Sequence, residues 1–146
     1  EVEGQDYYFV DREKFQRMID NGELLEWAEV FGNYYGTPAA PVRQAIEAGR
    51  IVVLEIDIQG GLQVHEARPD ATFILILPPS EQDLEKRLRG RRSEDEDSLA
   101  RRLAKAKWEI ETAQRSGVYK YQVVNDDLEK AIARVVEIVN QESGGK

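Results

Sequence analysis

The run of aliphatic residues from Ile51 to Ile56 constrains the fold more than any other stretch of this chain. The run is rich in β-branched side chains and is followed by Asp57, with Gly60 and Gly61 just beyond it. A continuous apolar run of this length is typical of a buried parallel strand that ends in an open turn. Ligands of α/β proteins bind beyond the carboxyl ends of such strands. We therefore expect Asp57 either at the edge of a binding site or as a simple cap of the following turn.

Further strands and helices alternate along the second half of the chain in the manner of an α/β fold. Apolar runs at residues 72–77 and 121–124 predict two more core strands, and residues between and after these runs have the apolar spacing of amphipathic helices. Ser80 follows two prolines and is expected to cap one of these helices. This alternation is the signature of a parallel sheet with crossover helices.

The first 37 residues have a different pattern of predicted secondary structure from the rest of the chain. Aromatic and apolar stretches at residues 7–10, 24–31 and 34–37 predict a small antiparallel sheet, with a turn at Gly32 and Asn33. Thr37 and Pro38 are expected to open the next helix as its N-cap and first residue. We therefore expect four parts, which are a small subdomain at 1–37, a core at 38–90, a lid at 91–116, and a core segment with a C-terminal helix at 117–146.

Composition limits the class of protein. The 146 residues are 41% hydrophobic and 33% charged, which suits one globular domain with its own core. The absence of cysteine excludes disulfides and thiolate metal sites and fits a reducing compartment. A formal charge of -8 argues against a nucleic-acid or membrane surface, and no apolar run is long enough for a membrane span. We expect a cytoplasmic protein that acts on a small molecule or on another protein.

A dense cluster of arginines lies between residues 87 and 92, next to Gly90, in an otherwise acidic chain. Arg91 precedes a predicted helix, and Arg102 lies about three turns along it. Arginine suits phosphate because its planar guanidinium donates two parallel hydrogen bonds and stays charged. The pair is therefore a candidate clamp for a polyanion on a movable arm. The alternative is a solvated helix face on which the arginines pair with the acidic residues at 94–97.

A purine ligand would give Glu26 and Thr37 a specific role. A carboxylate accepts two hydrogen bonds from adjacent donors, which guanine offers at N1 and its 2-amino group, while a hydroxyl can donate to O6. Adenine has an acceptor at N1 and would repel the same carboxylate, so such a site can reject the wrong base by roughly 10⁴-fold. Tyr7 and Tyr35 are candidate donors to a phosphate, although each could equally be a core residue with its hydroxyl at the surface.

Six segments, taken together, resemble guanylate kinase over essentially the whole chain and in the same order. They are the stretches at residues 6–10, 25–37, 54–60, 77–80, 87–91 and 123–127. Members of this family use ATP to phosphorylate GMP to GDP in purine nucleotide metabolism. The resemblance implies an α/β fold with a P-loop-type parallel sheet core, helices on both faces, a small antiparallel GMP-binding subdomain and a helical lid.

The resemblance also implies roles for particular residues on the GMP side. Glu26 and Thr37 would read guanine, and Tyr7 and Tyr35 would hold the GMP phosphate. Asp57 would border the GMP and Mg²⁺ region. No residue of this chain is assigned as a metal ligand.

On the ATP side, the resemblance implies that Arg91 and Arg102 are lid arginines that act on the transferring phosphate. Asn125 would lie near the adenine of ATP. The implied cofactors are ATP as phosphoryl donor and Mg²⁺. The implied partners are therefore small-molecule nucleotides, with no nucleic acid and no membrane, and the oligomeric state is left open.

One departure from the family pattern concerns the phosphate-binding loop. Family members carry an early strand and a glycine-rich loop that ends in Gly-Lys-Ser/Thr, and this sequence contains no such motif. We therefore expect the chain to be a fragment of a longer protein, without the first strand and P-loop and with little activity alone. The alternative is a non-catalytic guanylate-kinase-like protein-interaction domain whose ATP loop has decayed.

Overall fold

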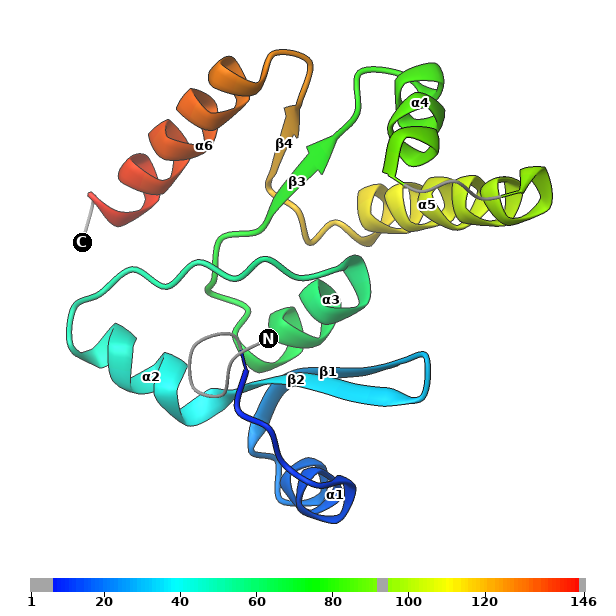
Figure 1. Ribbon diagram of the computed structural model, residues 1–146. Helices are drawn as coiled ribbons and strands as arrows, with labels where there is room; N and C mark the ends of the chain where they lie inside the picture. The colour runs from blue at the N-terminus through cyan, green and yellow to red at the C-terminus, as the bar shows by residue number, and fades with distance from the viewer. Residues whose placement is uncertain (1–6, 92–94, 145–146) are drawn as a thin grey trace. The chain divides into compact units, whose positions relative to one another are not determined.

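The computed structural model describes residues 7–91 and 95–144, and the chain divides into two compact units, Glu1–Pro69 and Asp70–Lys146. In the first unit the described elements are α1 (Arg12–Asp20), β1 (Leu24–Val30), β2 (Asn33–Pro38), α2 (Ala39–Glu47) and α3 (Ile58–Ala67). In the second unit they are β3 (Ile74–Leu77), α4 (Glu81–Arg91), α5 (Glu96–Ser116), β4 (Tyr121–Val124) and α6 (Leu128–Ser143). Figure 1 shows these elements along the chain.

The first unit is built around the antiparallel hairpin of β1 and β2, in which Glu26 lies opposite Thr37. Its two-residue turn consists of Phe31 and Gly32, whose φ angles are 51° and 80°. Two positive φ angles are typical of a type I′ turn, which matches the right-handed twist of the two strands. The predicted turn at Gly32 and Asn33 is therefore wrong by one residue.

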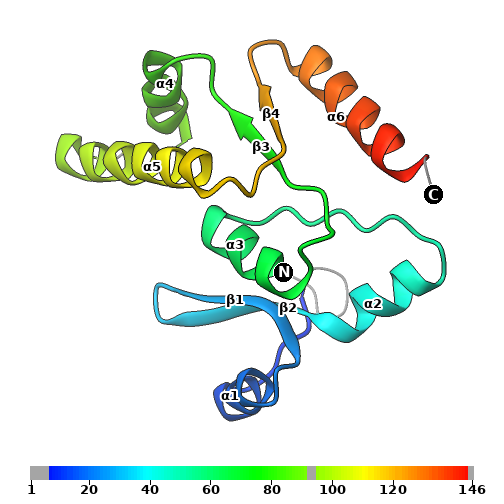
Figure 2. The ribbon, with the colours of Figure 1, turned by 180° about the vertical axis from the view of Figure 1, so that it is seen from behind.

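Two helices pack against this hairpin. Asp11 caps α1 by accepting a hydrogen bond from the Lys14 N–H at 2.7 Å, and the buried Phe15 ring of α1 stacks on Tyr34 of β2 with centroids 5.4 Å apart. The other helix, α3, lies beside β1, as both ribbon views show (Figures 1 and 2). The hairpin therefore packs against α1 and α3 of the first unit.

The predicted strand at residues 51–57 is not formed among the described residues. This stretch is extended chain without an assigned strand partner, and Ile51 and Val53 are 59% and 77% exposed. Apolar side chains indicate which residues favour burial, but a β-strand also requires backbone hydrogen bonds to a neighbouring strand. Asp57 accepts a hydrogen bond from the Gly60 N–H at 2.7 Å and so caps α3, which is the simpler of its two predicted roles.

Two other local predictions differ from the structure. Helix α2 begins one residue later than expected, with Pro38 at its N-cap and no side-chain capping bond, because the Thr37 hydroxyl is bonded elsewhere. The predicted strand at residues 7–10 is reduced to an isolated bridge at Tyr7. The antiparallel sheet is therefore a two-stranded hairpin in the described residues.

The second unit contains a two-stranded parallel sheet in which Ile74 to Leu77 pair with Tyr121 to Val124. Residues 121–124 were predicted as a strand with the same bounds, and the strand predicted at 72–77 begins two residues later. Buried Val123 of β4 packs with Ala131 and Ile138 of α6 to form the core of this unit. The α/β prediction is confirmed, although Ile76 is 48% exposed where full burial was expected.

The helices of the second unit begin with side-chain caps. The Ser80 hydroxyl accepts from the Asp83 N–H at 3.1 Å at the start of α4, as predicted. At the start of α5, Asp95 accepts from the Ser98 N–H at 2.7 Å. Gly117 ends α5 with a φ of 72°, the left-handed conformation that glycine adopts without strain.

Within residues 7–91 and 95–144, every helix is too short or too polar to cross a lipid bilayer.

Candidate guanine-reading site

The Glu26 carboxylate is the one charged side chain among the buried residues of the described chain, with 9% of its surface exposed. The Thr37 hydroxyl donates to its Oε1 at 2.7 Å from the facing strand. A carboxylate has about four acceptor positions, so one hydroxyl leaves most of its hydrogen-bonding capacity for other donors. The structure thus brings together the two residues that the sequence predicts as readers of guanine.

The second oxygen of Glu26 lies against the first turn of α3. A Cβ atom added to Gly60 would be 2.9 Å from Glu26 Oε2 and 3.2 Å from Asp57 Oδ1. Only a residue without a side chain lets the helix approach the carboxylate this closely. The predicted site residues Glu26, Thr37 and Asp57 therefore surround one small region of the first unit, with Gly60 between the two carboxylates.

Tyr7 and Tyr35 form a pair at the surface of the first unit. Their rings meet edge to face with centroids 5.7 Å apart, and they are 45% and 39% exposed. Neither ring is a core residue, which removes the alternative that was left open for both. Two neighbouring phenols at a surface can donate hydrogen bonds to the same anion.

Two residues of this site were not predicted from the sequence. They are Gly60 and Gln63, whose side-chain amide pairs with both main-chain polar groups of Trp27 at 3.0 Å. A signal for them does exist in the sequence. Gly60 and Gln63 follow Asp57 at intervals of three residues, the spacing that puts side chains on one face of a helix, so they share the face that carries the predicted site residue.

In the second unit, the main chain of Asn125 is held from two sides. Its N–H donates to the Leu77 carbonyl at 2.8 Å, and its carbonyl accepts from Arg87 Nη2 at 2.7 Å. Of the two predicted lid arginines, Arg102 lies within α5. Arg91 is the last residue of α4, and its side chain lies outside the described residues. The structure therefore does not bring these three predicted residues into one described cluster.

Arg87 and Arg89 of the arginine cluster make different contacts in the structure. Arg89 pairs with Glu85 at 2.9 Å and with Glu96 at 2.8 Å, which links α4 to the start of α5. The hydrogen bonds that Arg89 donates to Glu96, and next the one to Glu85, raise the pKa of Arg89, and hydrogen bonding to the same guanidinium lowers the pKa of Glu96. The predicted alternative of a solvated, ion-paired helix face is thus what the structure shows for Arg89, whereas Arg87 holds the Asn125 carbonyl.

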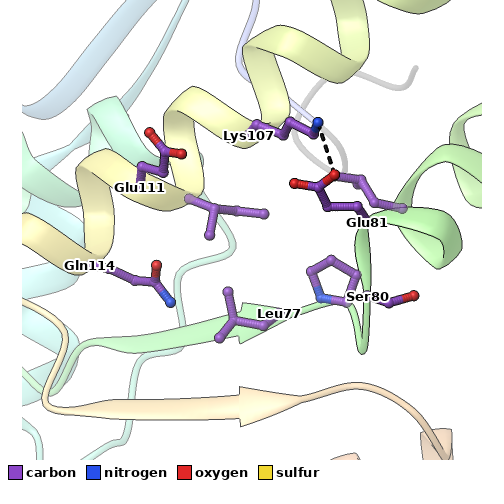
Figure 3. Close-up of a pocket in the computed structure, with 9 residues that line it drawn as sticks. Leu77, Ser80, Glu81, Lys107, Glu111 and Gln114 are labelled. Carbon is purple, nitrogen blue, oxygen red and sulfur yellow. Dashed lines mark ion pairs between the residues drawn. The ribbon is translucent and has the colours of Figure 1, made fainter.

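A shallow pocket of about 230 Å³ lies in the second unit between the end of β3, the start of α4 and the C-terminal half of α5 (Figure 3). Leu77 lies at its β3 side, and the Lys107 ammonium is 3.0 Å from the Glu81 carboxylate across its opening. None of the predicted site residues lines this pocket. The one cation among its lining residues, Lys107, is already paired with Glu81, and Glu111 adds a second carboxylate, so this pocket offers little to the phosphates of a nucleotide.

The described residues contain no group of three His, Cys, Asp or Glu side chains placed to hold a metal ion. Mg²⁺ in phosphoryl-transfer enzymes keeps several waters and is held by substrate phosphates with one or two carboxylates. A site of that kind needs no three-residue cluster, so the residues of this chain are compatible with Mg²⁺ that is bound together with a nucleotide.

Comparison with known proteins identifies the family. The family model for Guanylate kinase matches residues 1–142. Guanylate kinases from Synechocystis sp. and from Chromobacterium violaceum are 49% identical over 142 residues and 50% identical over 139 residues. These alignments cover 97% and 95% of this chain and 73% and 65% of the respective relatives. The chain therefore spans about two thirds to three quarters of the length of these relatives.

A solved structure agrees with the sequence comparison. The crystal structure of guanylate kinase from Anaplasma phagocytophilum is similar with a TM-score of 0.75 and 38% identity, over 98% of this chain and 68% of that chain. These relatives support GMP phosphorylation as the function, and the non-catalytic alternative has no support among them. The chain belongs to the guanylate kinase family, a family of nucleoside monophosphate kinases.

Proposed function

We propose that the protein transfers the terminal phosphoryl group of ATP to a phosphate oxygen of GMP, which gives GDP and ADP. The observation that carries this proposal is the buried Glu26 carboxylate, held by Thr37 on the facing strand. A buried charge is costly unless it is well bonded, so its retention favours a ligand that supplies further donors.

Guanine supplies those donors. Its N1–H and 2-amino group can donate to the two oxygens of Glu26, and its O6 can accept from the Thr37 hydroxyl once that hydroxyl turns from the carboxylate. Inosine monophosphate lacks only the 2-amino donor, whereas AMP presents an acceptor at N1. The affinities are therefore expected to fall from GMP to inosine monophosphate to AMP.

The phosphate of GMP is proposed to bind to Tyr7 and Tyr35. Their partly exposed, adjacent rings support this assignment. Asp57 is proposed to border the same ligand, because its carboxylate and that of Glu26 both lie within 3.2 Å of the position that a Cβ of Gly60 would take.

The family generally uses ATP and Mg²⁺, and we assign ATP as the phosphoryl donor for this protein. Arg91 and Arg102 are proposed to neutralise charge on the transferring phosphate, and Asn125 to contact adenine through a main chain fixed by Arg87. Mg²⁺, bound with ATP, supplies charge neutralisation at the phosphates. The predicted boundaries of the subdomain and lid, and the cytoplasmic location, stay predictions.

The direct test is calorimetric titration of this chain with GMP, inosine monophosphate and AMP. One lost hydrogen bond to a charged group is worth about 1.5–3 kcal/mol, so GMP should bind roughly 10- to 100-fold more tightly than inosine monophosphate. Replacement Glu26→Gln should remove most of this preference, because the amide offers a donor where guanine also donates. Equal affinities for the three nucleotides in the unmodified chain would refute the proposal.

Glu29→Gln is the matched control, since Glu29 is an exposed residue of the same strand. It should leave the preference for GMP unchanged. A coupled assay of GDP formation on the same sample tests the prediction that residues 1–146 have little activity alone. A turnover typical of a full kinase would contradict that prediction while it supports the assigned reaction.

A further inference from the structure

The side chain of Gln63 forms an unusual two-point contact with the main chain of β1. Its Oε1 accepts from the Trp27 N–H and its Nε2 donates to the Trp27 carbonyl, each at 3.0 Å. This is the pairing that a neighbouring β-strand would provide, supplied here by one carboxamide from α3. It satisfies both polar groups of Trp27 on the edge of β1 that β2 does not occupy.

The contact lies directly beside the guanine-reading carboxylate. The Trp27 N–H belongs to the same peptide group as the Glu26 carbonyl, and the two point in opposite directions because the peptide is planar and trans. By holding that N–H, Gln63 fixes the plane of the peptide that follows Glu26. The direction in which the Glu26 side chain leaves the strand is fixed with it.

Gln63 also sets the distance between α3 and β1. One turn earlier on the same helix, Gly60 lies against Glu26 Oε2, and Asp57 caps the helix. One residue further on, Val64 is 4% exposed. The helix is therefore attached to β1 by the two hydrogen bonds of Gln63, and Gly60 brings its first turn against the Glu26 carboxylate, which leaves that carboxylate little freedom to move.

We propose that Gln63 is a positioning residue for guanine selectivity, which holds the Glu26 carboxylate in the orientation that reads the base through its two hydrogen bonds to Trp27. This inference rests on the proposed function, because it requires that Glu26 contact guanine. Gln63 itself makes no contact with the nucleotide. Gln63 instead positions the Glu26 carboxylate, which makes that contact. A misplacement of about 1 Å in such a group can lower its contribution roughly 100-fold.

The test compares Gln63→Met with Gln16→Met in the full chain. Methionine is close to glutamine in length but cannot form either hydrogen bond. Gln16 is an exposed α1 residue whose amide donates to the Asp20 side chain at 3.0 Å, so its replacement removes a glutamine hydrogen bond that does not involve β1. Two quantities are measured, the ratio of GMP to inosine monophosphate affinity by calorimetry and the hydrogen-exchange rate of the Trp27 amide by NMR.

Gln63→Met is expected to speed exchange of the Trp27 amide and to lower the affinity ratio roughly tenfold, while Gln16→Met changes neither. In a Glu26→Gln background, Gln63→Met should lower the ratio no further, because the group that it positions is gone. A role limited to stability would not show this dependence on Glu26. Should Gln63→Met fail to fold, Gln63→Glu keeps the acceptor for Trp27 and should give an intermediate ratio.

Faster exchange with an unchanged affinity ratio would overturn the positioning role, and so would an equal loss in the Glu26→Gln background. These results leave the proposed function intact. If the unmodified chain does not prefer GMP, guanine reading fails and the positioning role fails with it. That outcome is seen before any variant is made, so the two failures are distinguishable.

Discussion

Gly60→Ala is a small change that should disturb the guanine-reading site strongly. The added methyl group would lie 2.9 Å from Glu26 Oε2, 3.2 Å from Asp57 Oδ1 and 3.3 Å from Ile56 Cβ. An ordinary contact to Oε2 needs about 3.4 Å, so the carboxylate or the helix must move by about 0.5 Å. Contacts on three sides leave the methyl group no open direction.

The expected cost is greater for binding than for folding. Alanine is favoured over glycine inside a helix by up to about 1 kcal/mol, which offsets part of the steric cost. The N–H of residue 60 still donates to Asp57, so the cap of α3 is kept. A displacement of this size in the reading carboxylate should lower GMP affinity roughly tenfold, if 1 Å costs about 100-fold. The free energy of unfolding should change by no more than about 1–2 kcal/mol.

Calorimetric titration with GMP and urea denaturation of the same sample measure the two effects. Gly90→Ala is the control for the helix preference of alanine over glycine. Outside the helix's own neighbouring backbone, no described atom lies within 4 Å of a Cβ at Gly90 of α4. It should stabilise the second unit slightly, by up to about 1 kcal/mol. Unchanged GMP affinity in Gly60→Ala would refute the reasoning, since it would mean that Oε2 does not need its present position.

Three further predictions concern stability and pH. Thr37→Val removes the hydroxyl donor of a buried carboxylate and should lower the free energy of unfolding by about 1–3 kcal/mol in urea denaturation. Ile138→Ala should lower the free energy of unfolding by about 2–5 kcal/mol, because Ile138 has no exposed surface. Ile132→Ala should lower it by less than about 1 kcal/mol, because Ile132 is 54% exposed. Equal losses in the two variants would contradict the described core. Arg89→Gln should raise the pKa of Glu96 towards the ordinary value near 4, measured by NMR titration of its carboxyl carbon, because Arg89 lowers that pKa in the folded chain. The Arg89–Glu96 ion pair therefore stabilises the fold at pH values above the ordinary carboxyl pKa, and this stabilisation is lost as the pH falls through the lowered pKa of Glu96. An unchanged titration midpoint of Glu96 in the variant would contradict this link.

Local sequence signals predicted the parts of the fold that depend on neighbouring residues. The strand at Tyr121–Val124 and the cap at Ser80 were both expected, because apolar runs and capping hydroxyls act over a few residues. The apolar run at residues 51–57 was as clear, but whether it becomes a strand depends on a backbone partner far away in the sequence. Periodicity carries no information about that partner.

The same distinction applies to the site. Sequence alone pairs Glu26 with Thr37, because their hydrogen-bonding groups complement one base, and the structure shows their contact. Gln63 was not, since a glutamine on a helix is ordinary in sequence and its partner is a main-chain group with no side-chain signature. Arg89 shows the opposite case, in which a residue of an apparently phosphate-binding cluster is engaged in ion pairs between two helices.

The groups proposed to distinguish the base all belong to residues 26–63, which lie within the first unit of the chain. A ribosome would therefore release the whole of this stretch while residues 70–146 were still being translated. Proteins generally fold domain by domain from the N-terminus during synthesis, and short-range contacts such as the hairpin form fast. The residues proposed to read guanine would then take up their arrangement in the nascent chain ahead of the arginines of α4 and α5.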